Sequence, residues 1–509
     1  MLKNTLNHWF RFSPAGRAPA REVSRLRTEA FAIFCLLMLV ASGATGRPAQ
    51  ASGLAEVTPD DALLFVEVTR PAELWNALQG SELRQAIRTS FYADLLVNFT
   101  AATTNVIARS LTDRSAGEVM ERYGLEIGIA FSPRKEKTKQ LGYVVLLEPV
   151  RHTTEFQNLI RERIDQTFKA RFPAIRISTD TVGDREIKRF ILSKRQSWSL
   201  AFLDNHVVFG HDAAIRWILE GKTFLSDKEG YRESRRRVHV PDEPNIFCYA
   251  EVTEAAGRNA LLYGAGTRIA AVLEVEGQMI RDKAIVSGNL KLPELGKAQG
   301  CKIGSAFPQG PYMVTQVSFA SGSQMLQYFG VLTASEATNQ SVDGIFTGTG
   351  FIATSPEFPK SSVIAAELVR AESAEILLKK LGFGRERKAW RMSNLKALVK
   401  DNILYLGRDS DIEALDDQFR STNSLKLDGV PAVNQQLKDL PEAHGHSYMA
   451  PAFLKRFARS ANLRQFEIVL ERLSPAVARA EKTRKGVVID SVSSHGYGIW
   501  LATVNLDLR

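Results

Sequence analysis

Short apolar runs and helical patterns alternate along the chain. Residues 63–68 (Leu-Leu-Phe-Val-Glu-Val) follow a Pro-Asp-Asp turn and predict a strand. Behind Pro71, Leu74 and Leu78 lie one helical turn apart, which predicts a helix whose first turn holds that proline. Thr154 precedes apolar residues at helical spacing, so we expect it to cap their helix.

The apolar runs 198–203 and 206–209 are separated only by Asp204-Asn205, a pair that tolerates the left-handed backbone of a tight hairpin turn. Gly210 ends the second run, and Asp212 is expected to cap a helix that starts at Ala213. Short strands joined by hairpins, with helices between them, predict an α+β fold. We expect an antiparallel sheet with helices packed mainly on one face.

The same plan occurs twice. Residues 204–215 and 401–412 share Asp, Asn, Gly, Asp and Ile at five of twelve positions without a gap. Further matches follow in the same order along both halves. They pair Pro59 with Pro308, Ile129–Pro133 with Ile352–Pro356, Val145–Glu148 with Ile364–Glu367, Pro241 with Pro441, and Asn289–Leu292 with Asn505–Leu508. We therefore predict two tandem similar lobes produced by duplication.

The predicted boundaries follow from these matches. The first lobe spans residues 52–292 and the second spans 308–509. Residues 293–307 have the glycine-rich character of a linker.

The N-terminus predicts export. Basic residues dominate the first 29 positions, an uncharged stretch covers residues 30–46, and Ala49-Gln50-Ala51 follows. This order is typical of a signal peptide cleaved after Ala51, so residues 1–51 would be removed and the protein would reside in the periplasm or outside the cell. The alternative is an uncleaved anchor that holds the chain at the inner membrane through residues 30–46.

Composition and charge exclude several classes of protein. With 44% hydrophobic and 24% charged residues, the 509-residue chain is neither disordered nor fibrous. The formal charge of +10 falls to +5 without the leader, which holds seven basic and two acidic side chains. A charge this mild does not predict nucleic-acid binding.

Motifs for catalysis are missing. The chain has no Gly-x-Ser-x-Gly, His-Glu-x-x-His or Walker sequence, so no catalytic residue and no cofactor is predicted. Gly348-Thr-Gly350 lacks the third glycine and the following helix of a dinucleotide loop. Cys248 and Cys301 remain after export, where an oxidising compartment allows a disulfide. We favour a buried apolar role for Cys248.

Two sets of side chains are candidates for binding. His444 and His446 would share one face of a strand and form a weak metal-like pair, without nearby Cys, Asp or Glu at ligand spacing. Arg232, Arg235, Arg236 and Arg237 form the densest basic cluster. Such clusters usually face solvent, and the functional alternative is contact with anionic lipid headgroups or acidic glycans of the envelope.

The combined pattern resembles a known bacterial family. Its features are an exported chain, a Pro-Asp-x-Ala-Leu-Leu-Phe-Val opening at residues 59–66, and the Phe-Leu-Asp-Asn-x-Val-Val pair of strands at 202–208 leading to Gly-x-Asp. These are similar to the exported family called domain of unknown function thirty-three fifty-two, over most of residues 55–509. The resemblance implies an envelope protein without assigned chemistry and carries over no catalytic residues.

We therefore expect a non-enzymatic binding or scaffold protein of the cell envelope, with a cleft between its lobes. A periplasmic hydrolase with a site of dispersed residues is the first alternative. The second is a carrier of lipid or another hydrophobic ligand, and the third is an assembly helper that contacts another envelope protein.

Overall fold

The computed structural model describes residues 53–88, 116–133, 142–193, 196–239, 245–252, 264–329, 342–355, 362–386, 389–421, 426–454, 470 and 472–503. The predicted leader and the predicted strand at 505–508 lie outside them. The described residues form two compact units. The N-terminal unit holds residues 53–290 and 494–503, and the C-terminal unit holds residues 291–493.

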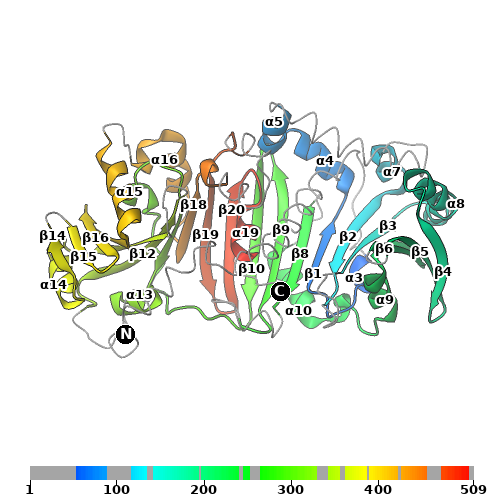
Figure 1. Ribbon diagram of the computed structural model, residues 1–509, viewed down its shortest axis with the longest axis horizontal. Helices are drawn as coiled ribbons and strands as arrows, with labels where there is room; N and C mark the ends of the chain where they lie inside the picture. The colour runs from blue at the N-terminus through cyan, green and yellow to red at the C-terminus, as the bar shows by residue number, and fades with distance from the viewer. Residues whose placement is uncertain are drawn as a thin grey trace. The chain divides into compact units, whose positions relative to one another are not determined.

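The N-terminal unit is built on one antiparallel sheet, visible in Figure 1. Its strands are β1 (Leu64–Val68), β2 (Leu125–Phe131), β3 (Tyr143–Pro149), β4 (Arg176–Val182), β5 (Arg185–Ser193), β6 (Gln196–Leu203), β7 (His206–His211), β8 (Asn245–Glu251), β9 (Arg268–Glu276) and β10 (Met279–Ser287). Within the unit they pair in the order β4-β5-β6-β7-β3-β2-β1-β8-β9-β10.

The helices of this unit lie before, between and after those strands. They are α3 (Leu54–Val57), α4 (Pro71–Gln79), α5 (Glu82–Arg88), α7 (Ala116–Tyr123), α8 (Thr153–Arg171), α9 (Asp212–Glu220), the 3₁₀ turn η1 (Leu225–Asp227), α10 (Glu229–Val238) and α19 (Tyr497–Thr503). Helix α4 begins at Pro71, as predicted. Helix α8 begins one residue before Thr154, after His152 in a left-handed conformation.

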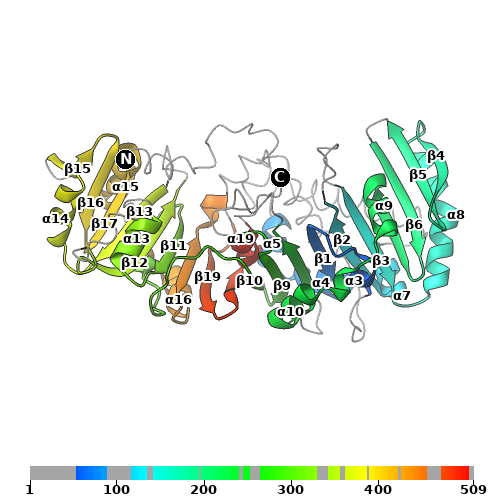
Figure 2. The same ribbon diagram turned by 90° about the horizontal axis from the view of Figure 1, so that it is seen from below.

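Helices cover both faces of this sheet, which differs from the expectation of one covered face. Leu74 of α4 packs with Val66 of β1, whereas Tyr231 of α10 packs on Phe65, the neighbouring residue of the same strand. Successive strand residues point to opposite faces. Figure 2 shows the same arrangement farther along, with α9 and α8 on opposite sides of β5 and β6. Residues on both faces of β1 are buried, so each face is covered.

The C-terminal unit has a sheet of the same order. Its strands are β11 (Met313–Ser318), β12 (Phe346–Thr354), β13 (Ser362–Leu368), β14 (Gly384–Glu386), β15 (Ala389–Met392), β16 (Leu395–Lys400), β17 (Ile403–Arg408), β18 (Gly445–Met449), β19 (Ala476–Thr483) and β20 (Gly486–Ser493). They pair antiparallel as β14-β15-β16-β17-β13-β12-β11-β18-β19-β20. Counted in chain order, this repeats the N-terminal unit strand for strand.

Its helices also occupy matching places. They are α12 (Ile303–Ala306), α13 (Gly322–Tyr328), α14 (Ser373–Lys380), α15 (Asp409–Arg420), the 3₁₀ turn η2 (Leu427–Gly429) and α16 (Pro431–Lys438). In both units the segment before the first strand pairs with the segment before the 3₁₀ turn, as Pro59 with Phe224 and Pro308 with Lys426.

Two segments take roles other than those expected. Residues 293–307, expected to be a linker, contain α12, and Ile303 and Phe307 are fully buried in the core of the C-terminal unit. Residues 494–503, expected in the second lobe, belong to the N-terminal unit, where Ile499 joins a core cluster and its backbone N–H donates to Asp282 at 2.6 Å.

The predicted hairpin turn is present in both units. Strands β6 and β7 are joined by Asp204-Asn205, and β16 and β17 by Asp401-Asn402. Asp204, Asp401 and Asn402 have positive φ, which the short side chains of Asp and Asn tolerate.

Candidate functional site

Arg235 of the predicted basic cluster points inward rather than to solvent. Its guanidinium donates to both carboxylate oxygens of Glu67 on β1, at 2.7 and 3.2 Å. It also lies 4.9 Å from the ring centroid of Phe247. The side chain of Glu67 is 1% exposed. Burial raises the pKa of the neighbouring Tyr231, and the Glu67 charge adds to the rise. Arg235 therefore fastens α10 to the sheet.

The other three arginines divide by exposure. Arg232 and Arg236 are exposed and lie one turn apart, and Arg237 is half-buried. The Nε of Arg236 donates to the backbone carbonyl of Arg232. The structure therefore places two charges of the cluster, Arg232 and Arg236, on the solvent face of α10.

The matching helix of the C-terminal unit keeps one of these two exposed charges, because Arg236 corresponds to Lys438 and Arg232 corresponds to Asn434. Counted from the 3₁₀ turns, Tyr231 corresponds to Val433 and Arg235 to Leu437, both buried. Lys438 is the single basic residue of α16. A helix at this place can therefore pack without any arginine.

The two histidines of the metal-like pair are both hydrogen-bonded. His444 precedes β18, and its Nδ1 lies 3.3 Å from the backbone nitrogen of Lys482, which donates to it. His446 is 1% exposed, and its Nε2 lies 3.0 Å from the carbonyl oxygen of Pro441. Burial lowers the pKa of His446. Among the described residues, no group of three or more His, Cys, Asp or Glu side chains could hold a metal ion.

The recurring Gly-x-Asp motif forms an ionic cluster instead of a helix cap. Helix α9 starts at Asp212 itself, because β7 continues through His211. The Asp212 carboxylate accepts from Ser199 at 2.8 Å, lies 3.0 Å from Arg189, and pairs with Arg216 within its own helix. Arg216 also bonds Asp180 of β4. The predicted N-cap role of Asp212 was wrong, because Asp212 is the first residue of α9 and its carboxylate is held by Ser199, Arg189 and Arg216.

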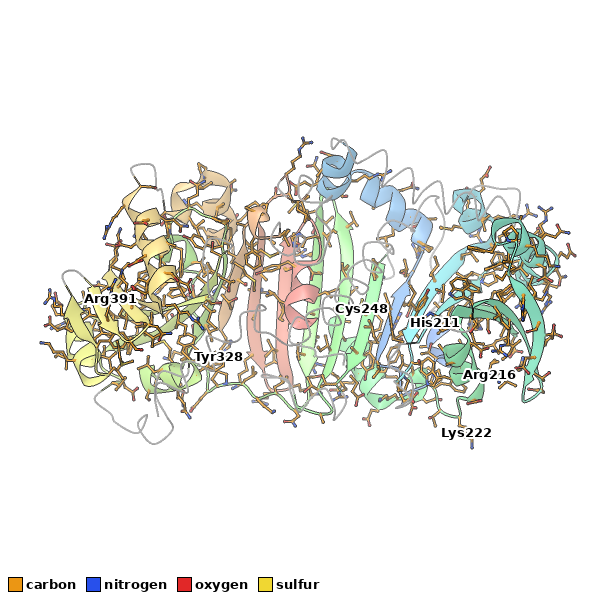
Figure 3. All side chains as sticks on the ribbon, viewed as in Figure 1. His211, Arg216, Lys222, Cys248, Tyr328 and Arg391 are labelled. Carbon is orange, nitrogen blue, oxygen red and sulfur yellow. The ribbon has the colours of Figure 1, made fainter. Side chains whose placement is uncertain are left out.

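The C-terminal unit has the equivalent cluster with the charges rearranged. Asp409 starts α15 and lies 3.2 Å from Arg391 of β15, and Lys396 of β16 reaches Glu413 at 3.0 Å. Figure 3 labels Arg216 and Arg391, one from each cluster. Asp409 and Arg391 match Asp212 and Arg189, whereas Glu413 replaces Arg216. A cluster that tolerates this exchange is consistent with a structural role.

A glutamate at matching places on β3 and β13 was missed as a site residue, although the repeat alignment contains it. Glu148 accepts from the backbone N–H of Gly53 at 2.9 Å. Glu367 accepts from Lys302 Nζ at 2.7 and 2.8 Å and from Thr347. Burial opposes ionisation of Glu367, but these donors prevail and lower its pKa. Both glutamates tie the first helical segment of a unit to its sheet.

The two cysteines are free thiols in the structure. Cys248 packs against the β1–β2 core, and burial raises its pKa to about 12. Cys301 packs against the core of the C-terminal unit, and burial raises its pKa to about 11. A thiol with a raised pKa is a poor nucleophile and a poor metal ligand near neutral pH.

No described helix combines the length and the apolar character needed to cross a bilayer.

Comparison with known proteins gives no relative. No family model matches the chain. No curated protein and no solved structure matches it either.

Proposed function

We propose that this chain is an exported protein of the bacterial cell envelope that acts by binding rather than by catalysis. Support comes from the chemistry of the described polar groups. Each of four carboxylates forms an ion pair with an arginine or lysine from another part of the same unit. They are Asp212, Asp409, Glu67 and Glu367. A hydrolase would need an acid, base or nucleophile that is available to substrate. The export step rests on the sequence of residues 1–51.

We further propose that the two units descend from one duplicated ancestor. The support is the strand order, which is the same in both units, together with four of the six sequence matches. Those four fall on corresponding strands or turns, or directly before them. The other two, Pro241 with Pro441 and Asn289 with Asn505, each include a residue outside the described part of the chain.

The binding surface that we propose is the solvent face of α10, and its partner is an anionic lipid surface. The observation that carries this proposal is the contrast between α10 and α16. At the same position in the fold α16 has Asn434 in place of Arg232 and the exposed Lys438 in place of Arg236, so the pair of exposed arginines occurs only on α10 and packing does not require Arg232. Each basic side chain near an anionic bilayer contributes about 1 kcal/mol.

Vesicle sedimentation tests this proposal. The chain without residues 1–51 should bind vesicles that contain phosphatidylglycerol, and should not bind vesicles of phosphatidylcholine alone. The double variant R232Q/R236Q should bind about 30-fold more weakly, because about 2 kcal/mol is lost. Added salt should weaken wild-type binding, because exposed charges are screened.

A matched control separates the α10 face from net charge. The variant K482Q/R484Q removes two exposed charges from the β19–β20 hairpin and should bind as the wild type does. Equal losses in both variants would mean that only net charge matters. Unchanged binding in R232Q/R236Q would refute the surface, and competition by a soluble acidic glycan would identify a glycan as the partner.

A further inference from the structure

Strand β4 is the outer edge of the sheet in the N-terminal unit. Among the described strands it pairs only with β5, from Arg176 opposite Ile191 to Val182 opposite Arg185. Figure 2 shows β4 beside β5 at the end of this sheet. The backbone N–H and C=O groups on its other side are the kind that a further strand can pair with.

This edge lacks most of the features that usually prevent strand addition, although it carries the charged residues Arg176 and Asp180. Natural edges are shortened, bulged, or carry proline or charged side chains, lysine above all. The corresponding edge strand of the C-terminal unit, β14, is three residues long. Strand β4 has seven residues, Arg-Ile-Ser-Thr-Asp-Thr-Val, with no proline, no lysine and no shift in its pairing with β5.

When two copies of β4 pair antiparallel, one register places their opposite charges next to each other. Arg176 and Asp180 are four residues apart and therefore lie on the same face of the strand. If two copies of β4 run antiparallel about a two-fold axis through Ser178, Arg176 of each copy lies opposite Asp180 of the other. Shifting the axis by one residue places Arg176 opposite Ser178 or Val182 instead.

The side chains near that axis are compatible with close approach. Arg176, Ser178, Thr179 and Thr181 are exposed. The Asp180 carboxylate accepts from the backbone N–H of Thr181 at 2.8 Å, pairs with Arg216 and lies 3.9 Å from Arg189, and its two oxygens can accept up to about four hydrogen bonds. Directly opposed unlike charges stabilise a strand pair.

We propose that β4 is the interface with a second copy of this chain. Two β4 strands pair antiparallel about Ser178 and join the sheets of two N-terminal units. A two-fold dimer of this kind uses one self-complementary surface twice. This inference is independent of the lipid-binding surface on α10.

Cysteine cross-linking in the full mature chain tests the register. In S178C the two new cysteines face each other across the axis, within the 4.4–6.8 Å Cα separation that a disulfide accepts, so mild oxidation should give a covalent dimer. In the control T181C, residue 181 lies opposite Ile175, so no such dimer should form. Equal cross-linking of both variants, or none in S178C, would overturn the proposal.

Sedimentation of a charge variant gives the second measurement. R176E places Glu opposite Asp180 at both ends of the interface and should weaken dimerisation at least tenfold. The control K169E makes the same change at an exposed position of α8 and should dimerise as the wild type does. A wild-type chain that stays monomeric at every concentration would also overturn the proposal.

Discussion

Single residues at matching positions show which chemistry the fold requires. Glu67 of β1 corresponds to Gln316 of β11, and both are fully buried. Arg235 of α10 corresponds to Leu437 of α16. At these matching positions the N-terminal unit has a buried ion pair, and the C-terminal unit has an amide and an aliphatic side chain. Gln316 accepts from the backbone of Lys302 and donates to Gly300.

This exchange predicts the effect of breaking the ion pair. R235L leaves the Glu67 carboxylate buried without its counter-charge and should lower the free energy of unfolding by about 3 kcal/mol. Chemical denaturation of the mature chain, followed by tryptophan fluorescence and circular dichroism, measures the change.

The double variant provides the control. E67Q/R235L copies the C-terminal unit and should recover most of the loss, because no unpaired charge remains. Equal destabilisation in the single and double variants would show that the arginine matters by its packing instead of its charge.

Because His446 is buried, we expect the folding stability of the C-terminal unit to depend on pH. His446 faces Gln316 of β11 on one side and Arg479 of β19 on the other, and burial lowers its pKa in the folded state. The unfolded chain then takes up the proton first as pH falls. The stability that neutral His446 contributes is fully present above the unfolded pKa of about 6.5. It is lost as the pH falls below that value.

The variant H446F tests this origin, because Phe247 fills the matching position in the N-terminal unit. Thermal unfolding measured from pH 8 to pH 5 should show a smaller loss of stability below pH 6.5 in H446F than in the wild type. The same loss in both proteins would assign the acid sensitivity to other groups.

At the scale of elements, both units place an Asp-Asn turn between the same two strands. Asn402 has φ +59°, a conformation that costs an alanine about 1 kcal/mol. We expect N402A to lower the free energy of unfolding by about that amount and N402G to be nearly neutral. Denaturation of the two variants measures both, and a larger loss in N402G would contradict the turn assignment.

Local pattern predicted most of these elements. The run 63–68 became β1, Pro71 began α4, and the turns at 204 and 401 formed because short-range signals determine them. Helix α9 begins at Asp212, one residue earlier than predicted, and the Asp212 carboxylate pairs with Arg189, which is distant in sequence. Long-range partners of this kind are not visible in local spacing.

The candidate site was predicted only in part for the same reason. The sequence identified four arginines as one cluster, but only the fold separates Arg235, which meets Glu67, from exposed Arg232 and Arg236. The pairing depends on β1 passing beneath α10. Glu148 and Glu367 were present in the repeat alignment, and their matching strand positions were the signal that could have identified them.

At the scale of the whole molecule, the two units have the same strand order, each around its own core. The N-terminal unit is also completed by residues from the end of the chain, because α19 packs on β10 and β9. Truncation before Tyr497 would therefore expose part of the N-terminal core, including the partners of Ile499.

Hydrogen exchange on the full mature chain tests the equivalence of the two units most directly. Central strands of a sheet open last, so amides of β1, β2 and β3 should exchange slowest in the N-terminal unit. Their counterparts β11, β12 and β13 should exchange slowest in the C-terminal unit, with the same ranking. Slow exchange in one set and rapid exchange in the other would contradict two equivalent units.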